Sequence, residues 1–420
     1  MLAGPQRMTG TGDQRQYDVI VWGASGFTGK LVVEYFLQQY GKDFNWAIAG
    51  RNRQKLEQML QELGVSDNAP DILIADSHDP VSMATLAKAT KVVLTTVGPY
   101  ALYGDLLVDA CAEHGTHYCD LAGEVQWMRR VIDRNQSIAE KSGARIVHSC
   151  GFDSIPSDLG VQFLQEQAVA RSGKPCKRVE LIVRAMRGGG SGGTIASGLN
   201  SLREARSDRE VARILARPYS LNPEGLRDGP DTWDQRGSRW NDLGEVWTAP
   251  FIMGVINMRN VRRSNAVLGF PWGKDFRYNE SVSTGPGMRG RLKAKGMTAG
   301  LGAFMLAGSY KVSRKLLIEK FLPAPGEGPD KEERESGFFK LQLFGELADG
   351  SILRATVTGD RDPGYGSTSK MLSESAVCLA SDHLESGGGC WTPASAMGAV
   401  LRERLIANAG LTFEIDCVSQ

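Results

Sequence analysis

The chain has 420 residues, of which 41% are hydrophobic and 23% are charged, and its formal net charge is +1 at pH 7. This length and hydrophobic content can fill the cores of two or three domains, and the balanced charge argues against a nucleic-acid partner. The seven cysteines are an odd, scattered set rather than a disulfide framework, which favours a reducing compartment such as the cytoplasm. Residues 1–16 are polar and glycine-rich, and we expect them to be disordered.

An apolar run at residues 17–22 leads directly into a glycine-rich turn at 23–29 and a predicted helix over 28–40. A strand, a glycine turn and a helix in this order form a dinucleotide site in doubly wound α/β domains, because small residues let the backbone approach the pyrophosphate. The spacing is G-x-x-G-x-x-G, with Ser25 where the plain motif has its second glycine. The predicted cofactor contacts in this turn are Gly23, Ser25, Gly26, Phe27, Thr28 and Gly29.

The second apolar run, residues 44–49, ends in Gly50 and Arg51. NAD-binding domains usually place an acidic residue near this point for the ribose 2′-hydroxyl, whereas a guanidinium suits the 2′-phosphate of NADP. Arg51 therefore predicts NADP as the cofactor, with a solvated arginine at a strand end as the alternative. We expect the adjacent Asn52 to contact the cofactor as well.

Residues 17–150 continue to alternate between strands and helices, which predicts a Rossmann domain with a parallel sheet of roughly six strands. The later predicted elements are strands at 71–74, 91–96, 117–119 and 145–150 and helices at 54–63, 80–88 and 104–114. Ligands bind beyond the carboxyl ends of such strands, which here are segments 75–76, 97–103, 120–124 and 151–158. Further cofactor contacts predicted at these ends are Asp76, Val97, Gly98, Pro99 and Tyr100.

Beyond residue 150 the alternation stops, and the pattern predicts an α+β substrate domain over residues 151–362. Its expected strands are 177–186, 251–258, 276–283, 338–347 and 352–357, with a helix at 194–205 and a surface loop at 221–243. The glycine run 188–193 predicts either a connector or a second anion cradle or lid. Residues 363–420 are expected to form helices, at 367–384 and 394–406, that pack back on the Rossmann domain.

Several segments together resemble the saccharopine dehydrogenase-like oxidoreductases, and most of all the branch that includes the mycobacterial trans-acting enoyl reductases. The resemblance is carried by residues 23–29, 49–51, 95–100, 120–124, 150–158, 321–329, 359–365 and 392–394. It implies an NADP-dependent enzyme of lipid or glycolipid assembly that reduces lipid-like or carrier-bound acyl thioesters, and we also expect a homodimer. Two alternatives stay open: a non-catalytic NADP-binding protein at lipid surfaces, and a saccharopine-type imine reductase. The second would need cations for substrate carboxylates, and the candidates are Arg184, Arg187, Arg262 and Arg263.

Other catalytic templates do not match the chain. No tyrosine is followed four residues later by lysine, as short-chain dehydrogenases require. A group of four residues, Cys111, His114, His117 and Cys119, lacks the paired C-x-x-C spacing of a zinc site, so we predict no metal. For hydride chemistry, the predicted catalytic residues at strand ends are Tyr103, as a hydrogen-bond donor to the thioester oxygen, and Asp120 and Asp153, which would orient that donor or relay the proton. Each has a structural alternative, since aspartates cap helices and tyrosines line pockets.

Residues 297–309 form an uncharged run of small and apolar residues between basic flanks. Thirteen helical residues reach only about 20 Å, less than the roughly 30 Å hydrocarbon core, so a transmembrane span is excluded. The run predicts a buried helix of the substrate domain. The alternative is peripheral attachment of residues 289–320 to an anionic lipid surface such as the plasma membrane, through basic residues on both flanks. These are Arg289, Arg291, Lys293, Lys295, Lys311, Arg314, Lys315 and Lys320.

Overall fold

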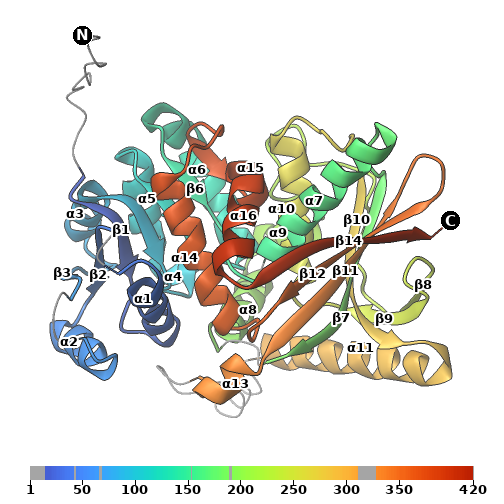
Figure 1. Cartoon of the computed structure of the whole chain (residues 1–420), viewed down its shortest axis with the longest axis horizontal. Coiled ribbons are helices and arrows are strands. Elements are labelled where there is room, and N and C mark those ends of the chain that lie inside the picture. The colour runs from blue at the N-terminus through green and yellow to red at the C-terminus, as the bar shows by residue number, and fades with distance from the viewer. Residues whose placement is uncertain are drawn as a thin grey trace, which may run out of the picture.

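The computed structural model describes residues 15–41, 44–65, 69–152, 154–188, 192–310 and 328–419. Within these residues the chain forms two seven-stranded sheets with helices packed against them (Figure 1). The first sheet comes mostly from the N-terminal third of the chain, and the second from the remainder. The C-terminal helices lie between the two sheets (Figure 1).

The first sheet is parallel throughout and has the order β13-β6-β5-β4-β1-β2-β3. Its first six strands follow the 3-2-1-4-5-6 order of a dinucleotide-binding doubly wound sheet, which confirms the predicted Rossmann domain. The strands are β1 (Tyr17–Trp22), β2 (Trp46–Gly50), β3 (Asp71–Ile74), β4 (Thr90–Thr95), β5 (His117–Cys119), β6 (Arg145–Val147) and β13 (Gly389–Trp391). The seventh, β13, was not predicted, because three residues are too few to show a periodic pattern.

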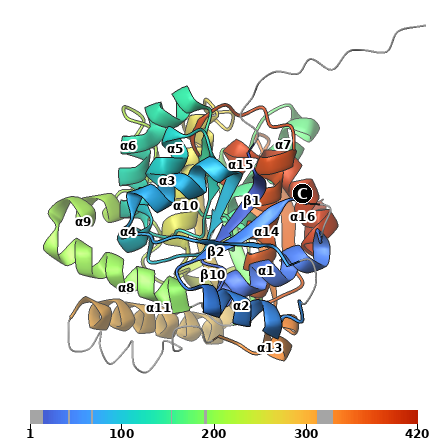
Figure 2. The same cartoon turned by 90° about the vertical axis from the view of Figure 1, so that its left-hand side faces the viewer.

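Both faces of this sheet are buried, as the continuous apolar strands require. Along β1, Val19 and Val21 belong to one hydrophobic core, whereas Ile20 and Trp22 belong to a second core on the opposite face. Helices α1 (Phe27–Gln39), α2 (Arg53–Glu62) and α14 (Gly366–Ser381) cover the first face. Helices α3 (Pro80–Ala89), α5 (Asp105–Glu113) and α6 (Val125–Ser142) cover the second (Figure 2).

The second sheet is mixed, with the order β14-β12-β11-β7-β10-β9-β8 and a single parallel pair, β7 with β10, among the described strands. One face packs on α7 (Ile155–Ser172) and α10 (Gly254–Val267), within the same hydrophobic core that α1 and α14 share with the first sheet. The strands are β7 (Arg178–Arg187), β8 (Arg239–Asn241), β9 (Val246–Pro250), β10 (Arg277–Gly285), β11 (Phe338–Glu346), β12 (Ile352–Gly359) and β14 (Leu411–Ser419).

Two sequence predictions differ from this architecture. The expected strand at 251–258 is wrong: β9 ends at Pro250 and the chain turns into α10. Residues 251–258 are mostly apolar because the start of α10 is largely buried, and a short apolar run does not distinguish a strand from a buried helix. The C-terminal segment is also not purely helical, since it adds β13 to the first sheet and β14 to the second, beside α15 (Pro393–Ala396) and α16 (Gly398–Asn408).

Three arginines of α10 are buried and hold the segment before β8 against the helix. Arg262 pairs with Asp231 at 3.0 Å and with Asp234 at 2.9 Å. Arg263 donates to the carbonyl oxygens of Leu221 and Cys390. Both were candidate ligands for a substrate carboxylate, and the structure instead commits them to internal partners.

The uncharged run at 297–309 lies in α11 (Gly287–Ser309), and the prediction that it is buried is wrong. Over the whole helix only Gly290, Ala294 and Gly308 are buried. Among the described residues, no helix combines the length and the hydropathy that a membrane crossing needs. Basic residues 311–320 of the predicted flank lie outside the described part of the chain.

Two buried carboxyl groups stand where the second sheet meets α7 and α10. Glu280 of β10 accepts hydrogen bonds from the Tyr278 hydroxyl at 2.7 Å and the Asn257 amide at 2.9 Å. Burial raises the pKa of Glu280 to about 7. Asp158 of α7 accepts from the Ser264 hydroxyl and the Ala394 N–H, and burial raises its pKa to about 6.

The raised pKa of Glu280 predicts that its contribution to the free energy of unfolding falls as the pH rises. Because the folded pKa of Glu280 lies above its unfolded value, folding favours the protonated acid, and this contribution is full below about pH 4 and lost as the pH passes about 7. Glu280→Gln removes the titration, so the free energy of unfolding of the wild type should fall relative to the variant by up to about 3 kcal/mol over this range. Urea unfolding of both proteins at pH 5 and pH 8 measures this difference, and parallel pH dependence would contradict it.

Candidate active site

The glycine-rich turn between β1 and α1 is a backbone cradle. Gly23 has a φ of +89°, and a Cβ there would lie 2.6 Å from Val97 Cγ2. A Cβ on Gly29 would lie 2.1 Å from the Gly23 carbonyl oxygen, so α1 begins in direct contact with the turn. Gly26 is the N-cap of α1 and no side chain caps the helix, which leaves N–H groups of the first turn for an anion. Gly26 and Ser25 are both exposed, and the cradle fits a pyrophosphate.

Arg51 lies beyond the carboxyl end of β2 with an exposed side chain. Within the described part of the chain, no hydrogen bond or ion pair holds its guanidinium. Its neighbour Asn52 caps α2 by accepting from the Lys55 N–H at 3.1 Å. Asp76, after β3, accepts from the His78 N–H at 2.9 Å, and this bond, with smaller contributions that include the charge of Arg51, lowers the pKa of Asp76. An unpaired guanidinium at this position fits a 2′-phosphate.

The segment after β4 is built around a buried carboxylate. Pro99 is the N-cap residue of helix α4 (Tyr100–Tyr103), and Glu124 accepts from the N–H groups of Tyr100 at 2.7 Å and Ala101 at 3.3 Å. The Tyr100 hydroxyl donates to the Thr95 carbonyl at 3.2 Å, and its ring stacks on Trp127. Tyr100 and Glu124 therefore shape the loop that carries Val97, Gly98 and Pro99 beside Gly23, and burial raises the pKa of Glu124.

Asp120 is fully buried and joins the ends of β5 and β6. Its Oδ2 accepts from the Tyr118 hydroxyl at 3.0 Å and lies 2.7 Å from His148 Nδ1. Its Oδ1 accepts from the N–H groups of Ala122 at 2.9 Å and Ser149 at 3.0 Å. With both oxygens committed, Asp120 acts through its neighbours. Sequence reasoning missed His148, since the strand-end segment considered began three residues later.

Tyr103 and Asp120 are not brought together. Tyr103 is half-exposed, and its ring meets the His78 ring edge-on at 5.6 Å between centroids. His78 Nδ1 lies 3.1 Å from Asp76 Oδ1, so Tyr103 lies on the β3 side of the site. Its hydroxyl has no hydrogen-bond partner among the described residues. Asp153, the third predicted catalytic residue, lies outside the described residues.

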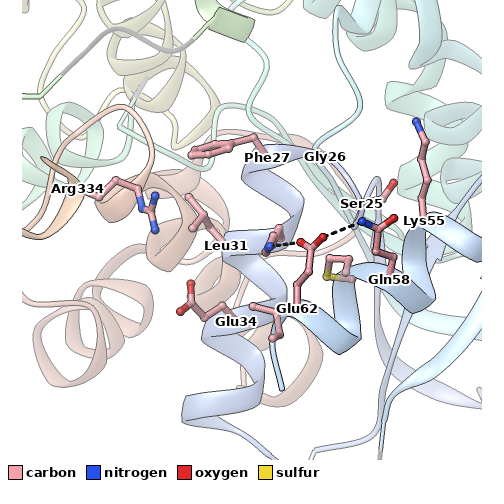
Figure 3. Close-up of a pocket in the computed structure, with 12 residues that line it drawn as sticks. Ser25, Gly26, Phe27, Leu31, Glu34, Lys55, Gln58, Glu62 and Arg334 are labelled. Carbon is pink, nitrogen blue, oxygen red and sulfur yellow. Dashed lines mark hydrogen bonds and ion pairs between the residues drawn. The ribbon is translucent and has the colours of Figure 1, made fainter. Parts of the chain in front are cut away.

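A cavity of about 470 Å³ opens beside the cradle, between α1 and α2. Figure 3 shows Ser25, Gly26 and Phe27 at its α1 end, Lys55 and Gln58 on α2, and Arg334 facing them from α13 (Lys331–Glu335). Inside it, Lys30 pairs with Glu62 at 2.6 Å. Lys55 and Arg334 were not predicted: Lys55 lies one helical turn past the expected contacts, and Arg334 comes from a distant part of the chain.

Phe27 connects the cradle to the rest of the molecule. Its ring meets Tyr365 edge-on at 4.8 Å, and the Arg334 guanidinium lies 5.6 Å from its centre. The Tyr365 hydroxyl accepts from the N–H of Gly192, the first residue of α8 (Gly192–Ser207). Helix α8 in turn contacts the β5 end, where Ser197 donates to Glu124 at 3.0 Å. Residues 189–191 of the predicted connector or lid lie outside the described residues.

A doubly wound sheet with a glycine cradle, an unpaired arginine after β2 and a second mixed sheet define a two-domain dinucleotide-binding oxidoreductase. Among the described residues, no group of three or more His, Cys, Asp or Glu side chains could hold a metal ion. Residues 19–147 match the family model described as the saccharopine dehydrogenase NADP binding domain.

Near-full-length relatives agree with this class. A candidate trans-acting enoyl reductase of Mycobacterium tuberculosis is 41% identical over 414 residues, which cover 96% of this chain and 98% of the relative. A trans-acting enoyl reductase of Mycobacterium ulcerans is 36% identical over 93% of this chain and 96% of its own length. Apo saccharopine dehydrogenase (L-Glu forming) from Saccharomyces cerevisiae has the same fold, with a TM-score of 0.54 at 12% identity over 96% of this chain and 99% of that one. The chain belongs to the saccharopine dehydrogenase-like family of oxidoreductases, which confirms the resemblance seen in the sequence.

The unpaired Arg51 predicts a preference for NADPH over NADH. Arg51→Ala should remove a charge-assisted contact worth about 1.5–3 kcal/mol, a loss of about 10- to 150-fold in NADPH affinity, with NADH affinity nearly unchanged. Titration of both cofactors by fluorescence measures it. Arg53→Ala is the matched control, since Arg53 is an exposed arginine two residues away whose guanidinium lies 3.8 Å from Glu57. Equal affinity of the wild type for NADH and NADPH would contradict the assignment.

Proposed function

We propose that this protein is an NADPH-dependent, trans-acting enoyl reductase. The observation that carries the proposal is similarity over nearly the whole chain to proteins named as such enzymes. The glycine cradle and Arg51 support NADPH as the cofactor, since one fits a pyrophosphate and the other a 2′-phosphate. When bound, NADPH supplies a hydride for the β-carbon of an α,β-unsaturated thioester.

The chain's own residues then have two tasks, which are to stabilise charge on the thioester oxygen and to guide a proton to the α-carbon. Tyr103 is our proposed donor to the oxygen, because its hydroxyl is half-exposed and without a partner among the described residues, whereas the Tyr100 hydroxyl is engaged. Asp120 serves as a positioning residue through Tyr118 and His148. Asp153 remains our proposed proton relay.

The two alternatives receive unequal support. An imine reductase would need cations for substrate carboxylates, but Arg262 and Arg263 are buried with internal partners. Arg184 is also engaged, donating to Gln342 at 2.6 Å and to the Gly244 carbonyl at 3.0 Å, whereas Arg187, the fourth candidate, is exposed at the end of β7. A non-catalytic NADP-binding protein would keep the cradle and Arg51 but would need no proton donor. Turnover measurements distinguish this non-catalytic alternative from the proposed enzyme.

The proposed substrate is a lipid-like acyl thioester, free or presented by a carrier protein, in lipid or glycolipid biosynthesis. Relatives named as enoyl reductases support the acyl class of substrate. We propose that the protein works in the cytoplasm and forms a homodimer, although the reduction itself does not need a second copy of the chain. The six cysteines whose side chains are described are buried and unpaired, as a reducing compartment favours.

The proposal predicts NADPH oxidation on addition of enoyl thioesters. Purified protein should consume NADPH with free or carrier-linked enoyl thioesters, and pairs of a keto acid and an amine should give no turnover. Absorbance at the nicotinamide band with product identification by mass spectrometry measures both. If protein that binds NADPH reduces neither class, the non-catalytic alternative replaces the proposal.

Tyr103→Phe separates two roles of this residue. As the donor to the thioester oxygen, Tyr103 should support turnover, and its loss should lower kcat about 100- to 1,000-fold while NADPH affinity stays unchanged. The competing role is that Tyr103 contacts the cofactor, since its ring meets His78 on the β3 side of the site. A raised KM for NADPH with normal kcat would assign that role and contradict the first. Tyr310→Phe, the same change at an exposed tyrosine directly after α11, is the control.

A further inference from the structure

Helix α11 presents an apolar face away from the protein. Its buried residues Gly290, Ala294 and Gly308 lie on one side of the helix. At 100° per residue, Met288, Leu292 and Leu306 fall on roughly the opposite side. These three side chains are 67%, 63% and 62% exposed. With the exposed Ala299 and Ala303 between them, they form the outer stripe of α11.

Basic residues border the N-terminal part of the outer stripe on both sides. By the same helical geometry Arg289 and Lys293 lie along one edge, and Arg291 and Lys295 along the other. All four are exposed, and residues 287–310 contain no Asp or Glu. Exposed apolar residues beside cations, with no acidic residue near them, suit a helix that lies on an anionic membrane, and the exposed Met297 and Met305 add apolar surface outside the outer stripe. An ordinary surface helix would point its apolar residues inward.

The inner side of α11 is fixed to the body of the protein. A Cβ on Gly290 would lie 2.0 Å from the Gly285 carbonyl oxygen, and one on Gly308 would lie 2.7 Å from a methyl of Leu199 in α8. Near the start of α11, the Thr284 hydroxyl donates to the carbonyls of Gly290 and Trp247, each at 2.9 Å. The helix therefore lies flat along its length, as Figures 1 and 2 show at the lower edge of the molecule, and the outer stripe has one fixed direction.

Two tryptophans extend this surface onto the second sheet. The Arg291 guanidinium lies 5.2 Å from the centre of the Trp247 ring, and Trp240 meets Trp247 edge-on at 6.0 Å. Trp240 lies on the edge strand β8 and is 41% exposed. Tryptophan concentrates at the level of lipid headgroups, because its ring is apolar and its N–H is polar.

We propose that α11, together with the β8–β9 edge, binds the surface of an anionic lipid membrane. The outer stripe enters the headgroup region, the four cations pair with lipid phosphates, and Trp240 lies at the same level. Because Gly308 of α11 packs on α8, which contacts Glu124 in the candidate active site, the bound membrane lies next to the helix that covers the strand ends. The proposal concerns attachment and is independent of which substrate is reduced.

Flotation of the full-length protein with vesicles tests this surface. Wild type should float with vesicles of equal parts phosphatidylglycerol and phosphatidylcholine, should not float with pure phosphatidylcholine, and should be released at high salt. Arg289→Ala and Lys293→Ala should each weaken binding about fivefold. The double variant Leu292→Glu with Leu306→Glu should abolish binding, whereas Ile406→Glu, the same change at an exposed residue of α16, should leave it unchanged.

Two further measurements make each outcome decisive. NADPH affinity and reduction of a soluble thioester should be normal in all of these variants, so a failure of attachment is distinct from a failure of the proposed enzyme. Absence of wild-type flotation at low salt would overturn the proposal, as would full binding by the double Leu→Glu variant. If light scattering shows a dimer that the double variant converts to monomer, a second copy of the chain covers the stripe and the proposal is wrong.

Discussion

The close approach of α1 to the turn before it is the constraint on which the site depends. Gly29 lies against the Gly23 carbonyl, and Gly23 in turn lies against the Val97 side chain, so segments from β1, α1 and the loop after β4 meet where neither glycine has room for a side chain. A side chain at either glycine would displace the helix start and withdraw the N–H groups that face an anion. The same contact sets the position of Phe27. The Phe27 ring meets Tyr365, and the Tyr365 hydroxyl accepts from the first residue of α8, so the turn is connected by direct contacts to the start of α14 and to α8.

Buried polar groups organise the neighbouring strand ends. Asp120 gathers donors from β5, β6 and the loops after them, and Glu124 caps α4 while accepting from Ser197 of α8. Each carboxylate has its oxygens engaged, which limits the cost of burying charge. The result is a rigid edge on which the loop after β4 and helix α8 are held in fixed relation.

Sequence reasoning identified the Rossmann sheet because its strands are continuous apolar runs and its turn contains glycines at fixed spacing. It failed where the hydrophobic pattern along the sequence does not indicate how a segment is buried in the structure. The start of α10 was predicted as a strand because its first residues form a short apolar run that also fits a buried strand, and β13 is too short to show a period. Contacts between distant segments, such as Arg334 with Phe27 or His148 with Asp120, depend on tertiary packing that spacing along the chain does not encode. The same holds for α11, whose apolar run faces outward.

Residues 366–419 complete both sheets, with β13 at the edge of the first and β14 at the edge of the second, and α14 covers β1 and β4. The nucleotide-binding unit is therefore discontinuous in sequence. During synthesis its first six strands emerge long before α14, so the part of the face that α14 covers, over β1 and β4, stays exposed until translation is nearly finished. A fragment that ends after β6 would keep the glycine motif but lack the cover that α14 gives to β1 and β4.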